Sequence, residues 1–228
     1  MEPPVIEIST TGGIEGTPVT ISLSASLTDV NVTSMEGIVI YVTGFPEGSS
    51  FNKGFSNDSV WTFAETDFGE VELTLPQYFS GDVVLMATAT YSSVSRVGTV
   101  DFTVEAIPDP PVLSVGEACF DPESSSVNFT IDSSLIDQDG SETLTIIIAN
   151  VPDNGYISVG LVMDNRKYLL LPEELTDIVL VLTGPFEPFI ITISALSTEV
   201  MNSEMAFSNV SLLIERCDIS GTTICKCK

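Results

Sequence analysis

Hydrophobic and polar residues alternate with a period of two along several short segments of the chain. One segment carries apolar residues at every second position with a small polar residue between them, and a second segment repeats the pattern: Val19, Ile21, Leu23, Ala25 and Leu27, then Val127, Phe129 and Ile131. This period is typical of a β-strand with one buried face. No segment shows a sustained helical period, although PEEL at 172–175 predicts one helical turn. The pattern therefore predicts an all-β protein of short strands separated by Gly, Pro, Asp and Asn.

The chain repeats itself with an offset of about 107 residues, which we treat as an internal repeat of one folding unit. PPVIEIS from Pro3 parallels PPVLSV from Pro110, and IVIYVTGFPEG from Ile38 parallels LTIIIANVPDN from Leu144. The repeat predicts two β-sandwich domains, residues 1–107 and 108–218, and leaves a Cys-containing tail, residues 219–228. The segment VEAIPDPPVL between them has three prolines in four positions, which predicts a short, stiff and extended linker.

The charge balance excludes several classes of function. Seven Lys and Arg stand against 32 Asp and Glu, so the formal net charge is −25. Nucleic acid and anionic membrane surfaces are poor partners for such a chain, and no apolar run approaches the length of a membrane span. The chain has no histidine, which removes the commonest general base and every His-bearing zinc site. With no nucleotide-binding or nucleophile motif either, we expect a protein that is not an enzyme; a hydrolase with a carboxylate pair is the remaining catalytic alternative.

Three carboxylates crowd the loop before the most apolar strand of the second unit, in LIDQDGSETLTIIIANVP. One interpretation of Asp137, Asp139 and Glu142 is a polar turn. The other is calcium, a hard cation that takes 6–8 oxygen ligands, so that other loops would have to contribute. An EF-hand does not fit, because position twelve counted from Asp137 is Ile148.

The repeat and the D-x-D-G-S-E segment together resemble the tandem immunoglobulin/cadherin-like domains of large extracellular bacterial adhesins of the RTX and VCBS type. The second unit matches in LIDQDGSETLTIIIANVP, and the first in VTGFPEGSSFNKG and SVWTFAETDFGEVELTLP. The resemblance implies two tandem immunoglobulin/cadherin-like β-sandwich domains with calcium at their junction. It implies Ca²⁺ ligands in the linker, in the top loops of the second unit and at the bottom of the first: Asp109, Asp137 and Asp139 first, then Glu15, Asp67, Glu105 and Glu142. The loop STEVMNSE, with Glu199 and Glu204, is expected at the same end as Asp137.

The first unit departs from this pattern, since TDVNVTSMEG stands where the second has DQDGSE. Four Asn-x-Ser/Thr triplets are a further departure from the bacterial adhesins and, with the acidic composition, favour a secreted glycoprotein. The candidate glycosylation sites are Asn31, Asn57, Asn128 and Asn209.

The cysteines all belong to the second unit and its tail. Cys119 follows the first strand of that unit and Cys217 the last, so both are expected near one end of the sandwich, where a Cys119–Cys217 disulfide would form. Four cysteines allow three pairings, and the spacing alone does not choose among them. Cys225 and Cys227 could instead pair with Cys217 or a neighbouring chain, and a zinc site is the alternative.

The single tryptophan, Trp61, begins a strand after a turn and corresponds to Tyr168 at the 107-residue offset. We expect it to anchor the core; exposure beside Tyr41 or Tyr91 would favour a sugar-binding platform instead.

These observations predict a non-enzymatic structural or adhesion segment, extracellular or at a cell surface, that calcium rigidifies at the interdomain junction. Its partners would be neighbouring repeat domains of the same or a like chain. Two alternatives are a subunit of an extracellular filament or surface appendage, and a module that binds a cell-surface carbohydrate or protein.

Overall fold

The fold was taken from a computed structural model, which describes residues 2–28, 37–57, 59–163 and 166–217. The chain divides into two compact units, Met1–Ile107 (unit 1) and Pro108–Lys228 (unit 2).

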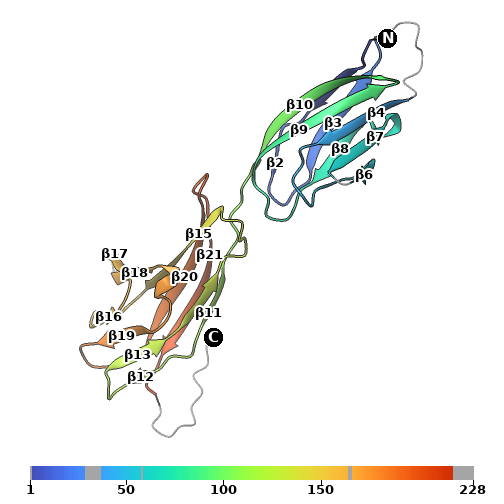
Figure 1. The fold of residues 1–228 in the computed structure, drawn as a ribbon. Coiled ribbons are helices and arrows are strands. Elements are labelled where there is room, and N and C mark those ends of the chain that lie inside the picture. Colours follow the sequence, from blue (N-terminus) through green and yellow to red (C-terminus); the bar gives the residue numbers. More distant parts are fainter. Residues whose placement is uncertain (1, 29–36, 58, 164–165, 218–228) are drawn as a thin grey trace. The chain divides into compact units, whose positions relative to one another are not determined.

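Unit 1 consists of two antiparallel sheets (Figure 1). The smaller sheet has the strand order β1 (Val5–Ser9), β3 (Val19–Ser26), β8 (Gly69–Thr74) and β5 (Ser50–Phe51). The larger has the order β2 (Gly13–Ile14), β10 (Val94–Glu105), β9 (Gly81–Tyr91), β4 (Ile38–Thr43), β7 (Val60–Ala64) and β6 (Phe55–Asn57), and within it β2 runs parallel to β10. A 3-10 turn, η1 (Glu65–Asp67), joins β7 to β8.

Unit 2 repeats this arrangement (Figure 1). Its larger sheet has the order β17 (Leu161–Met163), β18 (Lys167–Leu170), β15 (Glu142–Ala149), β20 (Phe189–Glu199) and β21 (Met205–Ile214). The opposite face is formed by β11 (Val112–Val115) with β14 (Ile131–Ser134), and by β12 (Phe120–Asp121), β13 (Ser126–Phe129), β19 (Ile178–Leu182) and β16 (Gly155–Ile157). The 3-10 turn η3 (Pro172–Glu174) lies where the sequence predicts a helical turn.

The hydrophobic cores follow from the alternation of residues along the strands. In β3 the four apolar residues that alternate with Thr and Ser are all buried, and their polar neighbours are exposed. In unit 2 the corresponding buried residues, Val127, Phe129 and Ile131, are divided between two strands. The first two lie in β13, which pairs with β19, and Ile131 begins β14, which pairs with β11. Burial of these side chains is the main term that stabilises each sandwich.

The order of elements supports an immunoglobulin-like sandwich in each unit. In unit 1 the third, sixth and seventh main strands (β4, β9 and β10) lie in one sheet, and the first, second and fifth (β1, β3 and β8) lie in the other. In unit 2, β15, β20 and β21 lie in one sheet, and the opposite face is divided between the pair β11 with β14 and the sheet that holds β13 and β19. This distribution of strands over two faces is the immunoglobulin arrangement. The prediction of an all-β chain with two tandem immunoglobulin-like β-sandwich domains is confirmed.

Trp61 lies where the core-anchor interpretation places it. Its ring is half-buried and packs beside Phe51 at a centroid distance of 5.4 Å. The indole N–H donates to the backbone oxygen of Lys53 at 2.7 Å, so the polar atom of the ring is satisfied inside the fold.

Candidate metal site

Two glutamates form the last cross-strand pair at one end of unit 2. Glu142, the first residue of β15, pairs with Glu199, the last residue of β20. Both side chains occupy the inner phase of their strands, and only 6% of Glu142 and 1% of Glu199 are exposed. Carboxylates are rarely buried this deeply, so the pair is an unusual polar feature of the unit.

The loop before β15 adds a third buried carboxylate. Asp137 is 3% exposed, and its two oxygens accept hydrogen bonds from the Asp139 N–H at 2.9 Å and from the Ser141 hydroxyl at 3.1 Å. Asp139 is exposed, and its Oδ1 accepts a bond from the Ser141 N–H at 2.7 Å. The side chains thus fold the loop into a local turn, as the turn interpretation requires. The turn accounts for the oxygens of Asp137 but not for the burial of Glu142 and Glu199.

The connecting segment is fastened to the same end of unit 2 through Asp109. The Asp109 N–H donates to Glu142 Oε1 at 2.8 Å, and the Asp109 carbonyl accepts a bond from the Ser197 hydroxyl at 2.6 Å. Two residues further on, the Pro111 carbonyl accepts a bond from the Ser208 hydroxyl at 2.7 Å. The prolines lack an N–H, so the segment is held by its carbonyls and by the one N–H of Asp109.

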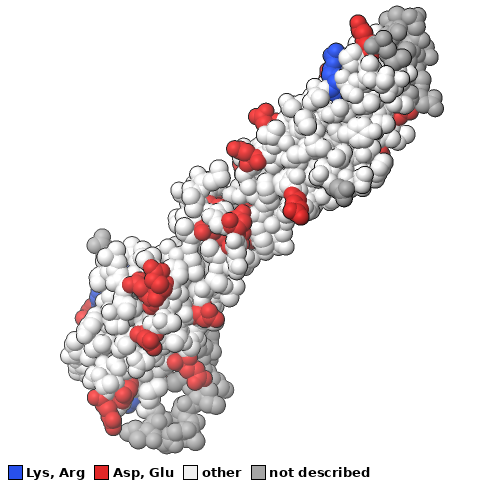
Figure 2. Space-filling view, viewed as in Figure 1, with Lys and Arg blue, Asp and Glu red and all other residues white. Residues whose placement is uncertain are grey.

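The electrostatics of this end are unfavourable to a bare anion. Burial raises the pKa of the Glu142 carboxyl, and the nearby charges of Asp137 and Asp109 raise it further, against the opposing effects of the Asp109 N–H bond and of the Ser197 hydroxyl. Glu142 Oε2 is buried and has no hydrogen-bond partner. The ion pair between Arg166 and Asp153 involves neither Glu142 nor Asp137 nor Asp109, and acids far outnumber Lys and Arg on the face of the molecule drawn in Figure 2. An ionised carboxylate in such surroundings is costly unless a cation joins it.

The donor set fits calcium in chemistry but is not arranged as a finished coordination shell. Carboxylate, hydroxyl and backbone oxygens are the ligands that a hard cation prefers. However, within the described residues no group of three or more Cys, Asp or Glu side chains is disposed to hold a metal ion. The oxygens of Asp137 and Asp139 are engaged in the loop's own bonds. Binding of an ion would therefore require these side chains to exchange internal hydrogen bonds for the metal.

The expected ligands of unit 1 fall into two places. The Glu15 N–H donates to the Glu105 carbonyl at 2.9 Å, and one Glu15 carboxylate oxygen accepts a bond from the Ile107 N–H at 3.1 Å. These residues share the end of unit 1 where β10 finishes. The register of β3 with β8 (Val19 with Leu73, Leu23 with Gly69) places Asp67, just before β8, towards the opposite end. There its carboxylate accepts a bond from the Ala64 N–H at 3.0 Å. The structure does not bring Asp67 together with Glu15 and Glu105.

Cys119 and Cys217 form a disulfide in unit 2. Cys225, Cys227 and the rest of the tail from residue 218 lie outside the described residues, as does Asn31. The other three candidate glycosylation sites, Asn57, Asn128 and Asn209, are all exposed on strands. Glycosylation itself stays a prediction.

Two residues of this end were not among the expected ligands. Glu199 was expected only as a neighbour, and Ser197 was not singled out. The alternation of residues along β20 could have identified them, because Ile191, Ile193 and Ala195 are buried at every second position. Ser197 and Glu199 continue that buried phase with polar groups.

Comparison with known proteins assigns the chain to no family. No protein-family model matches the chain, and no curated protein does. Among solved structures, the D00–D0 domain of intimin has 13% identity and a TM-score of 0.34, with 94% of this chain and 100% of that chain covered. A chimeric titin Z1Z2 has 15% identity and a TM-score of 0.30, with 94% and 98% covered.

The assignment of the fold rests on the strand order within each unit. Among the described residues, no helix is long and apolar enough to cross a membrane. The chain is thus similar in architecture to tandem immunoglobulin-like domains.

Proposed function

We propose that this chain is a non-enzymatic, extracellular segment of an adhesion-type protein, and that calcium binds at the acidic end of unit 2. The acidic end is defined here by Asp109, Asp137, Asp139, Glu142 and Glu199. The proposal joins the structural role of two tandem modules to a metal that would hold the connecting segment onto unit 2. The single observation that carries it is the buried and unpartnered Glu142 Oε2.

Calcium would offset the charge that the fold leaves uncompensated at this end. Glu142 and Asp137 are both more than nine-tenths buried, and neither takes part in an ion pair with Lys or Arg within the described residues. A divalent cation would neutralise them and satisfy Glu142 Oε2. Asp109 and Asp139 are the better exposed carboxylates at the same end and would turn inward to complete the shell with backbone oxygens and water.

The mechanical consequence follows from Asp109, because this residue lies in the proline-rich connecting segment. Without the ion, the like charges of Asp109, Asp137 and Glu142 weaken the bond that fixes the segment to β15. With the ion, the same groups share one cation, and the segment becomes a fixed extension of unit 2. Participation of Glu15 and Glu105 from unit 1 in the same site stays a prediction.

Extracellular location and the adhesin type are the finer part of the proposal. The Cys119–Cys217 disulfide favours an oxidising compartment, because such bonds are rare in reducing cell interiors. The sequons at exposed strand positions agree with this location. The resemblance of LIDQDGSETLTIIIANVP to repeat domains of RTX- and VCBS-type adhesins supports the same class.

The test is calorimetric titration of the full chain, stripped of metal, with Ca²⁺ and in parallel with Mg²⁺. We expect saturable Ca²⁺ binding with a Kd of roughly 10⁻⁴–10⁻³ M, typical of extracellular modules, and weaker binding of Mg²⁺. Glu142→Gln should weaken Ca²⁺ binding by at least about tenfold, since it removes one buried charged ligand.

A matched control is Glu123→Gln, which changes the exposed side chain of a glutamate in the β12–β13 turn of the same unit. It should leave the titration unchanged. No saturable heat with Ca²⁺, or equal loss in the two variants, would rule out the site at the acidic end.

A further inference from the structure

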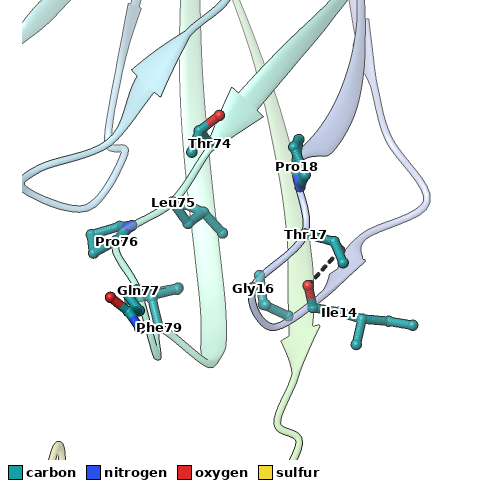
Figure 3. Close-up of a pocket in the computed structure, with 10 residues that line it drawn as sticks. Ile14, Gly16, Thr17, Pro18, Thr74, Leu75, Pro76, Gln77 and Phe79 are labelled. Carbon is teal, nitrogen blue, oxygen red and sulfur yellow. Dashed lines mark hydrogen bonds between the residues drawn. The ribbon is translucent and has the colours of Figure 1, made fainter.

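Unit 1 has an open apolar pocket at the end where β10 finishes (Figure 3). The pocket has a volume of about 270 Å³. On one side lies the β2–β3 turn, where the Thr17 hydroxyl donates to the Ile14 carbonyl at 2.6 Å, and on the other lies the β8–β9 loop. The side chains that line it are apolar or uncharged and include Ile14, Thr17, Pro18, Leu75, Phe79 and Val104. Sites for drug-sized ligands are typically larger, about 300–1,000 Å³, so this pocket suits a single side chain.

Unit 2 has a stacked aromatic pair at the end where its last strand, β21, finishes. Phe120 of β12 is buried and stacks on Phe186 of the β19–β20 loop, with ring centroids 4.3 Å apart and an interplanar angle of 6°. The Arg216 guanidinium lies over the Phe186 ring at 5.9 Å from its centroid. An aromatic ring and a guanidinium therefore close this end of unit 2.

The backbone shows that Phe120 and Glu15 occupy corresponding places. The Phe120 N–H donates to the Glu215 carbonyl in unit 2 at 2.7 Å, and the Glu15 N–H donates to the Glu105 carbonyl in unit 1 at 2.9 Å. Each bond ties the short strand, β12 or β2, to the end of the last strand. Phe79 lies in the β8–β9 loop of unit 1 as Phe186 lies in the β19–β20 loop of unit 2. Unit 1 thus has a phenylalanine in this loop, Phe79, as unit 2 does. At the position of Phe120, however, unit 1 has Glu15.

The basic residue is exchanged in the same way. Arg216 lies opposite Phe120 in the parallel bridge of unit 2. Ala106, between the two residues that bond to Glu15, has the corresponding place in unit 1. Unit 1 therefore lacks both the aromatic and the cationic group that close unit 2. The exposed Glu105 follows the lining residue Val104 in sequence, and the buried Glu15 stands between the lining residues Ile14 and Gly16.

We propose that the pocket of unit 1 binds an aromatic side chain adjacent to an arginine or lysine, presented by an extended segment of a partner protein. The ring would stack on Phe79 as Phe120 stacks on Phe186, and the cation would lie against the acids, in a chain whose net charge is −25. Aromatic and Arg anchors in small desolvated pockets are the usual centres of protein interfaces. The residues that line the pocket all belong to unit 1. Glu15 and Glu105 are the acids that this proposal shares with the predicted calcium ligands, so the experiment is carried out in chelator.

The experiment uses the full chain with labelled Ile, Leu and Val methyl groups and three capped dipeptides: Phe-Arg, Phe-Glu and Ala-Arg. The Ile14, Leu75 and Val104 methyls report on the pocket, and the Ile193 and Leu180 methyls in the core of unit 2 are internal references. Phe-Arg should shift the pocket methyls in a saturable way, with a Kd in the range of about 1 mM expected for so small a ligand. Phe-Glu should bind more weakly, and Ala-Arg should not bind.

Two variants decide whether the shifts arise in the pocket. Phe79→Leu removes the stacking partner and should weaken Phe-Arg roughly 2–10-fold, the factor that an aromatic pair contributes. Phe68→Leu changes a partly buried aromatic residue outside the pocket lining and should leave the affinity unchanged. The double variant Glu15→Phe with Ala106→Arg transfers the closure of unit 2 to unit 1 and should abolish the shifts.

The proposal is wrong if no peptide shifts the pocket methyls up to about 10 mM, a range that would reveal even millimolar binding. It is equally wrong if Ala-Arg matches Phe-Arg, because the interaction is then one of charge alone. Identical effects of Phe79→Leu and Phe68→Leu would also overturn it.

Discussion

The two units differ at the first residue of the third main strand, which is β4 in unit 1 and β15 in unit 2. In unit 1 the first residue of β4, Ile38, pairs with the last residue of β9, Tyr91. In unit 2 the first residue of β15, Glu142, pairs with the last residue of β20, Glu199. An apolar pair closes the first sandwich, so this topology does not require acids there. Because burying two carboxylates opposes folding, this difference between the units is the place where we propose a ligand for unit 2.

A second difference lies in how each unit fastens its last strand. Unit 1 uses the Glu15 carboxylate, which accepts a bond from the Ile107 N–H at 3.1 Å. Unit 2 uses the Cys119–Cys217 disulfide next to the corresponding bond of Phe120. Both devices hold a short strand against the end of the last one, and only their chemistry differs. Glu15 therefore has a structural task within unit 1, whether or not it also binds a metal.

The largest effect on stability is expected from removing the Cys119–Cys217 disulfide. The double variant Cys119→Ser with Cys217→Ser opens a loop with a sequence separation of 98 residues. It should lower the free energy of unfolding of unit 2 by about 2–5 kcal/mol, because the unfolded chain regains the freedom that the bond removes. Differential scanning calorimetry of the full chain measures this, and the transition of unit 1 is the internal control. A shift of both transitions by equal amounts would show that the units do not melt separately.

The next effect comes from transferring the apolar pair of unit 1 to unit 2. Glu142→Ile with Glu199→Tyr should stabilise unit 2 by about 1–4 kcal/mol in the presence of a chelator, the range found when buried ionic groups are replaced by packed apolar ones. Chemical unfolding in chelator and in calcium measures both the gain and the loss of calcium dependence. A destabilised variant in chelator would mean that the two glutamates are compensated by contacts that do not require a metal.

A smaller effect is expected at the fastening of unit 1. Glu15→Gln keeps the shape of the side chain and replaces a charged acceptor with a neutral one. It should lower the stability of unit 1 by about 0.5–1.5 kcal/mol, the net contribution of one hydrogen bond. Amide exchange at Ile107 should quicken in the same variant, while unit 2 keeps its exchange rates. Unchanged exchange at Ile107 would show that the carboxylate does not hold the end of β10.

The smallest effect concerns pH, and its sign follows from Glu142. Burial raises the pKa of this carboxyl above its ordinary value near 4.5. The folded state therefore takes up the proton at a higher pH than the unfolded state. In chelator, unit 2 should become more stable as the pH falls through the folded pKa towards 4.5, and the penalty of the charged form should return as the pH rises again.

Calcium should reverse this dependence, because protons and the metal compete for Glu142. Glu142→Gln removes the titrating group and should flatten the profile in chelator. Melting curves of the wild type and the variant across the weakly acidic range give the comparison, and superimposable profiles would contradict the assignment to Glu142.

The fold was predictable from sequence because its signal is repeated and local. The alternation from Val19 to Ala25 marks a strand with one buried face, and the 107-residue repeat doubles each such signal. The disulfide between Cys119 and Cys217 was one of three pairings open to four cysteines, and it depends on contacts between strands far apart in sequence.

The candidate site was only partly predictable, since it depends on the register between strands. Asp67 lies towards the far end of unit 1 because β3 and β8 pair with Leu23 opposite Gly69, which composition does not reveal. Glu199 faces Glu142 because β20 and β15 pair in one particular register. The motif marked the loop, but the tertiary pairing determined which acids are buried.

The most direct test of the account is the melting of the full chain by scanning calorimetry with about 1 mM Ca²⁺ and with chelator. For one site with a Kd of about 10⁻⁴ M, we expect calcium to stabilise unit 2 by about 1.4 kcal/mol. We expect no comparable change in unit 1 and at most about 0.4 kcal/mol in the Glu142→Gln variant, because its Kd is at least tenfold higher. A melting profile of unit 2 that is the same with and without calcium would contradict the central claim that the acidic end is a metal site.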